Sequence, residues 1–121
     1  MVQSSNPLLF ISIVIPVYNE LNTIKSILES VQRQDIRDVK LETIVVDDGS
    51  DDGTTEILQS NPHLYDHLIL NPVNLGKGGA VREGLRASNG DFVLFQDADL
   101  EYDPIEYKKL FAPVLDFEAD V

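Results

Sequence analysis

The chain has 121 residues, of which 43% are hydrophobic, so it has the length and composition to bury the core of one domain. Its formal net charge of −12 argues against nucleic acid as a partner and against electrostatic docking on anionic membranes, although an anionic substrate held by local cations stays open. The lack of cysteine excludes disulfides and thiolate metal sites, and no apolar run approaches the roughly 20 residues that a membrane span needs.

The first predicted strand covers residues 8–17, LLFISIVIPV, and is rich in Ile and Val, as fully buried parallel strands are. Pro16 ends its hydrogen-bonded ladder because proline has no N–H to donate. Asn22 or Thr23 can cap the helix that follows, which we expect to run to about residue 34. The apolar stripe of this helix has helical spacing and consists of Ile24, Ile27, Leu28 and Val31.

Strands and helices alternate along the rest of the chain, at residues 41–46, 54–59, 68–70, 78–87 and 92–96, before a last helix that Asp103-Pro104 opens. We expect Val81 and Leu85 to face the core and residues 92–95 to form a buried strand. A β-α repeat of this kind predicts a doubly wound, mostly parallel, Rossmann-like α/β sheet with right-handed crossovers. The expected strand order is 3-2-1-4, within a single domain over residues 1–121.

Acidic residues follow the last predicted strand, at Asp97, Asp99 and Glu101. On an extended segment alternate side chains share a face, so these carboxylates can point the same way at the carboxyl end of the strand, where open α/β sheets bind ligands. Their repulsion, roughly a kcal/mol or more per pair, would be removed by a divalent cation, and oxygen-only ligands suit Mg²⁺ or Mn²⁺. A solvated acidic loop is the alternative, because D-x-D triplets are common by chance.

Other polar segments follow the earlier strands. Tyr18 could stack on a base or ribose, Glu20 could accept hydrogen bonds from hydroxyls, and a carboxylate in the DDGS run at 47–50 could accept them from a base or ribose. The glycine-rich run 74–82, NLGKGGAVR, precedes a helix whose N-terminus favours phosphate, and it carries two cations, Lys77 and Arg82. Each segment alone is explained by turn geometry. Together, at one edge of one sheet, they predict a nucleoside-diphosphate site.

These motifs resemble those of family-2 glycosyltransferases with the GT-A fold, especially the polyprenyl-phosphate sugar transferases of the dolichyl-phosphate mannose synthase kind. The motifs that carry the resemblance are residues 13–20 IVIPVYNE, 44–52 IVVDDGSDD, 74–80 NLGKGGA and 90–100 GDFVLFQDADL. They cover nearly the whole chain in the family's order and spacing. As a set they are specific to the family, although none of them is specific alone.

The resemblance implies a role for each matching residue. Nucleotide contacts are implied for Pro16, Tyr18 and Glu20, with Asp47 reading the base and Lys77 and Arg82 near the phosphates. Asp97 and Asp99 correspond to the family's D-x-D pair, which holds a divalent metal, Mg²⁺ or Mn²⁺, against the nucleotide diphosphate. Glu101 stands where relatives often have a Gln that reaches the metal, so it keeps an oxygen ligand and adds a charge.

The implied activity is inverting transfer of a sugar from a UDP- or GDP-sugar to an acceptor such as a polyprenyl phosphate or a saccharide. Family members are longer, and the acceptor half and a general base are expected beyond Val121. We therefore expect the chain to be the N-terminal donor-binding part of a longer enzyme. Its expected location is the cytoplasm, or the cytoplasmic face of a membrane for a lipid acceptor, and a homo-oligomer stays open.

Two alternatives stay open. The chain could bind nucleotide without catalysing transfer by itself. It could also be a nucleotidyltransferase, which shares the donor geometry. A glycine-rich basic loop is expected after the first strand of that class, and Tyr18-Asn19-Glu20 occupies this place here, which counts against it.

Overall fold

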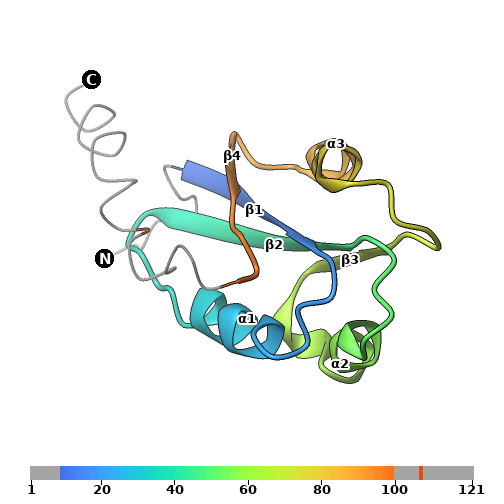
Figure 1. The fold of residues 1–121 in the computed structure, drawn as a ribbon. Coiled ribbons are helices and arrows are strands. Elements are labelled where there is room, and N and C mark those ends of the chain that lie inside the picture. Colours follow the sequence, from blue (N-terminus) through green and yellow to red (C-terminus); the bar gives the residue numbers. More distant parts are fainter. Residues whose placement is uncertain (1–8, 100–106, 108–121) are drawn as a thin grey trace.

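The computed structural model describes residues 9–99 and Tyr107, and these form an α/β fold around one sheet (Figure 1). The sheet has four parallel strands in the order β3-β2-β1-β4, which confirms the predicted fold class and strand order. The strands are β1 Leu9–Val17, β2 Val39–Asp47, β3 His67–Leu70 and β4 Phe92–Phe95. The helices are α1 Ile24–Gln32, α2 Thr54–Ser60, α3 Lys77–Ala87 and a short 3-10 helix, Pro62–Leu64.

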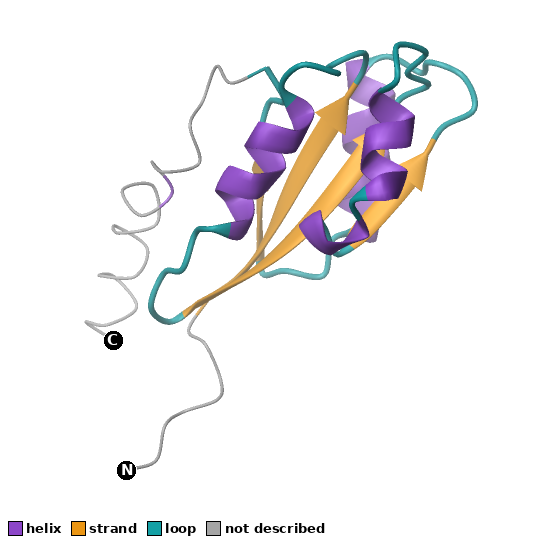
Figure 2. Cartoon of the chain, turned by 90° about the horizontal axis from the view of Figure 1, so that it is seen from below, coloured by secondary structure: helices purple, strands orange, loops and turns teal. Residues whose placement is uncertain are grey.

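The helices cover both faces of the sheet, with α1 and α2 on one face and α3 on the other (Figure 2). Side chains alternate along β1, because successive residues of a strand point to opposite faces. Ile13 and Ile15 belong to the core cluster shared with α1 and α2, whereas Val14 belongs to the cluster shared with α3. The predicted apolar stripe of α1 is confirmed, since Ile24, Ile27, Leu28 and Val31 are all buried.

Several element boundaries differ from the predicted ones. Helix α1 ends at Gln32 rather than near residue 34, and the Thr23 side chain makes no capping hydrogen bond although Thr23 holds the N-cap position. Strand β2 is longer than predicted at both ends, from Val39 to Asp47. The prediction that Pro16 ends the ladder of the first strand is wrong, because β1 continues to Val17, whose carbonyl accepts from the N–H of Asp48. Among the described helices, none combines the length and the hydropathy that a membrane span requires.

The prediction that Leu85 faces the core is wrong, because its side chain is 50% exposed. The buried residues of α3 are instead the small ones, Ala80 and Gly84. A Cβ atom on Gly84 would lie 2.3 Å from Cγ1 of Val14, so α3 approaches β1 more closely than a side chain at this position would allow. The close approach sets which side of α3 is inside, and it leaves Val81 half-buried.

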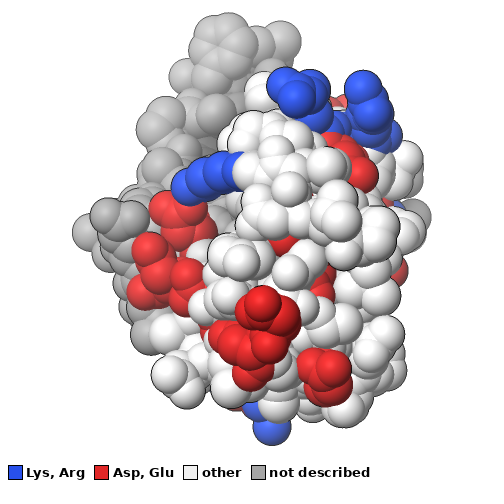
Figure 3. Space-filling view, turned by 45° about the vertical axis from the view of Figure 1, so that its right-hand side comes forward, with Lys and Arg blue, Asp and Glu red and all other residues white. Residues whose placement is uncertain are grey.

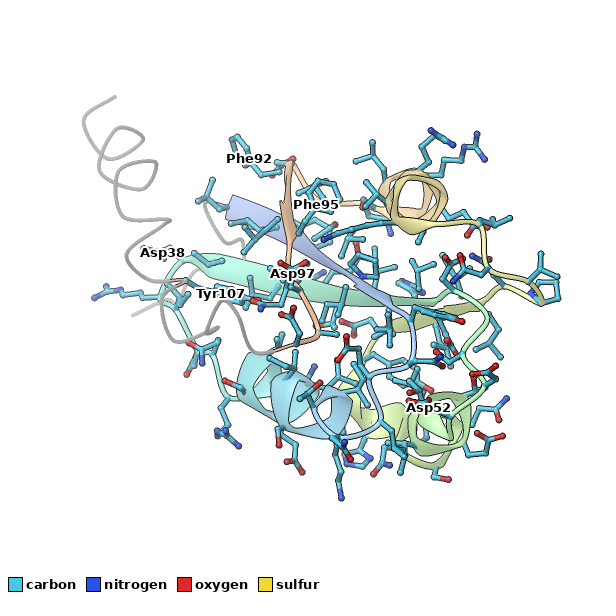
Figure 4. All side chains as sticks on the ribbon, in the orientation of Figure 1. Asp38, Asp52, Phe92, Phe95, Asp97 and Tyr107 are labelled. Atoms are coloured by element: carbon cyan, nitrogen blue, oxygen red, sulfur yellow. The ribbon has the colours of Figure 1, made fainter. Side chains whose placement is uncertain are left out.

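The prediction of a buried last strand is also wrong. Phe92 and Phe95 are 50% and 45% exposed (Figure 4), because β4 is at the edge of the sheet that the described residues form. Strand β4 ends at Phe95, although the N–H of Gln96 still donates to the carbonyl of Val14 at 2.9 Å. Glu101 and the predicted start of the last helix lie outside the described residues; Tyr107 is helical and fully buried.

A buried carboxylate ties the strands together at the amino edge of the sheet. Glu42 of β2 is 7% exposed and accepts hydrogen bonds from the Ser12 hydroxyl at 2.7 Å and from the Asn89 side chain at 2.8 Å. Its Oε1 lies 3.4 Å from Nε2 of His67. Burial raises the pKa of Glu42, but the hydrogen bonds from Ser12 and Asn89, with the nearby His67, outweigh it and hold the pKa below its ordinary value.

Replacing Glu42→Gln should therefore lower stability and remove part of its dependence on acid. A folded-state pKa below the unfolded value stabilises the protein above about pH 4.5, and this contribution is lost as the pH falls through the folded value. An amide cannot accept all the hydrogen bonds of the carboxylate, so we expect a loss of about 1–3 kcal/mol at pH 7. Urea unfolding at several pH values measures both effects.

The matched control is Glu56→Gln, which removes an exposed carboxylate on α2 and should change stability little. An acid dependence in the Glu42→Gln variant as steep as in the unchanged protein would contradict the role given to Glu42.

Candidate functional site

A cleft of about 290 Å³ lies at the carboxyl edge of the sheet. Loops from four different strand ends line it, as expected for an open α/β sheet. Its lining residues are Pro16, Val17, Tyr18, Glu20, Asp48, Asn74, Gly76, Lys77, Ala80, Asp97, Ala98 and Asp99. Most of the residues singled out in the sequence therefore meet in one place: Pro16, Tyr18, Glu20, Lys77, Asp97 and Asp99.

Asp47, predicted to read a base, does not line this cleft; its neighbour Asp48 does. The Asp47 carboxylate is buried and accepts hydrogen bonds from the backbone N–H of Ser50 and from the hydroxyl of Thr55 at the start of α2. The alternation of β2 would have indicated this, since Asp47 shares the face of Val45, which packs in the cluster with α1 and α2. Asp47 thus supports the turn that presents Asp48.

Asp48 is a nearly fully buried carboxylate at the cleft. Its Oδ1 accepts hydrogen bonds from the side-chain amide of Asn71 and from the backbone N–H of Leu75, both at 2.9 Å. Both of the hydrogen bonds that Asp48 accepts from the described residues end on Oδ1, so Oδ2 takes part in neither of them. These bonds also hold the loop after β3 against the loop after β2.

Arg82, the second predicted cation, is exposed on α3 and does not line the cleft. It follows Lys77 by five positions, which turns it about 140° around the helix. Only one of the two side chains can face the cleft from the same helix, and Lys77 at the first turn is the one that does. The spacing of Lys77 and Arg82 in the sequence would therefore have indicated that they point to different sides of the helix.

Lys77 and Asp97 form an ion pair across the cleft, with Nζ 2.8 Å from Oδ1. Both side chains are partly exposed, at 70% and 38%, so the pair contributes at most about 1 kcal/mol. Figure 4 shows Asp97 just beyond the end of β4. The ion pair places an ammonium group beside the carboxylates that the sequence proposed as metal ligands.

The chemistry of the donors at this end of the cleft fits a hard divalent cation. Asp97 and Asp99 both line the cleft, and Mg²⁺ is commonly held by one or two carboxylates together with substrate phosphates. Among the described residues no group of at least three His, Cys, Asp or Glu side chains could hold a metal. The predicted third ligand, Glu101, lies outside them. Ala98 and Asp99 form a turn, so the chain does not stay extended through the pair as expected.

Acidic side chains gather in several groups on the face that carries the carboxyl ends of the strands (Figure 3). An anionic ligand bound there would be repelled unless cations offset the charge. Among the residues lining the cleft, Lys77 is the basic side chain. A diphosphate in this cleft therefore calls for a metal ion in addition to Lys77.

The loops after β1 and β2 are joined by hydrogen bonds that the sequence did not indicate. Asn19 has a left-handed backbone, with φ of 53°, and its N–H donates to the Ser50 hydroxyl at 2.9 Å. Its side-chain oxygen accepts from the N–H of Asp51 at 2.8 Å. Asparagine tolerates positive φ better than most residues, which was the available signal.

The family model described as glycosyl transferase family 2 matches residues 12–121. The undecaprenyl-phosphate 4-deoxy-4-formamido-L-arabinose transferase of Pseudomonas syringae pv. syringae (strain B728a) is 38% identical over 109 residues, which cover 86% of this chain and 32% of that protein. The chain thus spans about a third of the length of the curated relatives that it matches.

Solved structures agree with this family. The mannosyltransferase PcManGT from Pyrobaculum calidifontis, in complex with GDP-Man and Mn²⁺, matches with a TM-score of 0.67 and 34% identity, over 75% of this chain and 28% of that chain. Glucosyl-3-phosphoglycerate synthase from Mycobacterium tuberculosis, in complex with Mn²⁺, UDP and glucosyl-3-phosphoglycerate, matches with a TM-score of 0.71 and 32% identity, over 89% of this chain and 40% of that chain.

The packing of the loops yields a testable contrast between two glycines. Gly49 has φ of +77°, and a Cβ atom there would lie 2.8 Å from the backbone nitrogen of Asn74. Gly78, in the first turn of α3, would meet nothing within 4 Å. We expect Gly49→Ala to lower the free energy of unfolding by about 1–3 kcal/mol. We expect Gly78→Ala to leave the free energy of unfolding unchanged or to raise it by up to about 1 kcal/mol. Chemical denaturation measures both; equal effects would contradict the close approach of the loops.

Proposed function

The chain belongs to glycosyl transferase family 2, and we propose that it forms the donor-binding part of an inverting glycosyltransferase that uses a UDP- or GDP-sugar. The observation that carries the proposal is the convergence of an aromatic side chain, a lysine and the D-x-D carboxylates on one cleft. The relatives with Mn²⁺ complexes hold GDP-Man or UDP. The acceptor would be a polyprenyl phosphate or a saccharide, in keeping with the relative named for undecaprenyl phosphate.

The nucleoside would occupy the side of the cleft formed by the loops after β1 and β2. Tyr18 is 46% exposed at the cleft and would stack on the base or ribose. Oδ2 of Asp48 would accept an N–H of the base, and Glu20 would accept a ribose hydroxyl. Asp47, from its buried position, would act on the base only by holding the turn that carries Asp48.

The diphosphate would lie against Lys77, Asp97 and Asp99. These two carboxylates, with Glu101, would hold Mg²⁺ or Mn²⁺. When bound, such a cation supplies positive charge that stabilises the departing diphosphate. Lys77 would turn from Asp97 to a phosphate oxygen and add to that stabilisation. A phosphate acceptor is already nucleophilic and needs less help from a base, and no general base is assigned among the described residues.

Nucleotide binding without transfer is the second candidate, because the chain spans about a third of its relatives. Calorimetry with UDP and GDP, with and without Mn²⁺, tests binding. A sugar-nucleotide hydrolysis assay on the same protein tests chemistry. Binding of neither nucleotide under any of these conditions would refute both candidates.

Asp99→Asn should separate metal-dependent from metal-independent binding. The variant keeps the shape of the side chain and removes one carboxylate charge from the cleft. We expect Mn²⁺ to tighten UDP or GDP binding to the unchanged protein, and this gain to fall at least about tenfold in the variant. Asp91→Asn, an exposed change before β4 at the amino edge of the sheet, is the control. A full gain in the Asp99→Asn variant would count against Asp99 as a ligand.

Lys77→Met should change metal and nucleotide affinities in opposite directions. Without the ammonium group, Asp97 loses a competitor for Mn²⁺, so Mn²⁺ alone should bind about 1.4- to fivefold more tightly, as expected from an exposed pair worth ~0.2–1 kcal/mol. The nucleotide without metal should bind more weakly, because a cation at the phosphates is lost. Lys40→Met, at the far end of β2, is the control for net charge. Weaker binding of Mn²⁺ alone would contradict the exchange of partners.

A further inference from the structure

The segment that carries Asp97 and Asp99 is held from inside the protein by two side-chain donors. The Gln96 amide donates to the carbonyl oxygen of Asp97 at 3.1 Å. The Thr23 hydroxyl donates to the carbonyl oxygen of Ala98 at 2.5 Å. Gln96 and Ala98 are buried, at 0% and 4% exposure, whereas Asp97 and Asp99 line the cleft. Protein donors thus satisfy the carbonyls of both Asp97 and Ala98.

Gln96 is itself fixed by its surroundings. The hydroxyl of Tyr107, which is fully buried, donates to Oε1 of Gln96 at 2.7 Å. Because Oε1 accepts from Tyr107, the amide nitrogen is directed toward Asp97. The backbone N–H of Gln96 donates to Val14 of β1 at 2.9 Å, which anchors the same residue to the sheet. Contacts with buried residues, and not with solvent, therefore fix the position of the backbone at Gln96 and Asp97.

Thr23 connects the two sides of the cleft. It holds the N-cap position of α1, yet its side chain makes no capping bond and turns to Ala98 instead. Its Oγ1 also lies 3.2 Å from Oε2 of Glu20. A hydroxyl has one hydrogen to donate, and the shorter distance assigns it to Ala98. The residue at the start of α1 thereby ties the loop bearing Tyr18 and Glu20 to the turn bearing Asp99.

We propose that Thr23 is a positioning residue for the segment with Asp97 and Asp99, which would hold the metal and the diphosphate. Gln96, fixed by Tyr107, supports the same segment from inside the protein. This inference rests on the proposed function. Two carboxylates of like charge repel, and a divalent cation requires them in a narrow range of positions. A turn that is already held in place needs less ordering when the cation and nucleotide bind. Removing the hydroxyl should therefore weaken binding at carboxylates that Thr23 does not touch.

The test is a Mn²⁺ titration in the presence of UDP, and separately of GDP, that reads free Mn²⁺ by electron paramagnetic resonance. Thr23→Val keeps the shape of the side chain and removes the donor, and we expect about tenfold weaker Mn²⁺ binding, the usual size of effect for a residue that orients metal ligands. Thr23→Ser keeps the hydroxyl and should stay within about twofold of the unchanged protein. Thr23→Ala also removes the donor but adds no methyl group in place of the hydroxyl, so the same loss of Mn²⁺ affinity in this variant would show that crowding by valine is not the cause.

The control for a merely structural role is Ser88→Ala, which also removes a hydroxyl-to-carbonyl hydrogen bond, to Gly84 at 2.8 Å, beyond the end of α3. Urea unfolding of each variant measures its stability. If Thr23→Val and Ser88→Ala are destabilised alike and both keep the Mn²⁺ affinity of the unchanged protein, Thr23 has no positioning role. If the unchanged protein binds no Mn²⁺ with either nucleotide, the proposed function is wrong and this inference is wrong with it.

Discussion

The parallel pairing of β1 with a strand on each side is the constraint on which the rest of the structure depends. Asp47 of β2 pairs with Val17 and also with Leu70 of β3, so these strands end at one level. Strand β4 is different, because its last residue, Phe95, pairs with Val14. The chain therefore leaves β4 before β1 reaches its end, and the D-x-D segment lies beside the end of β1. This offset in the register creates the hollow where the loops meet.

The carboxyl edge of the sheet carries more negative than positive side chains. The protein as a whole is strongly acidic, and within the cleft one lysine faces several carboxylates. Asp48 is the most deeply placed of these, and hydrogen bonds from Asn71 and Leu75 offset the cost of burying it. An edge of this kind suits a ligand that arrives with its own cation better than a bare anion.

The sequence allowed the fold and most of the cleft to be predicted, because both follow from the order of elements. Alternating strands and helices indicate a parallel sheet, and parallel strands bring Tyr18, Lys77 and Asp97 to one edge without any knowledge of contacts. What could not be predicted depends on distance between elements. Leu85 lies outside because Gly84 lets α3 approach β1, a fact that helical spacing does not contain. The position of Asp47, by contrast, could have been predicted, because the alternation of β2 puts it on the same face as Val45.

The polar network around Glu42 lies at the amino edge of the sheet, at the opposite end from the cleft. The polar network that stabilises the fold and the cleft that would bind a ligand therefore lie at opposite ends of the same strands. Sequence change at the cleft can therefore alter what is bound there without touching the contacts of Glu42. Such a division would let the ligand change while the hydrogen bonds that join the strands at the amino edge are kept.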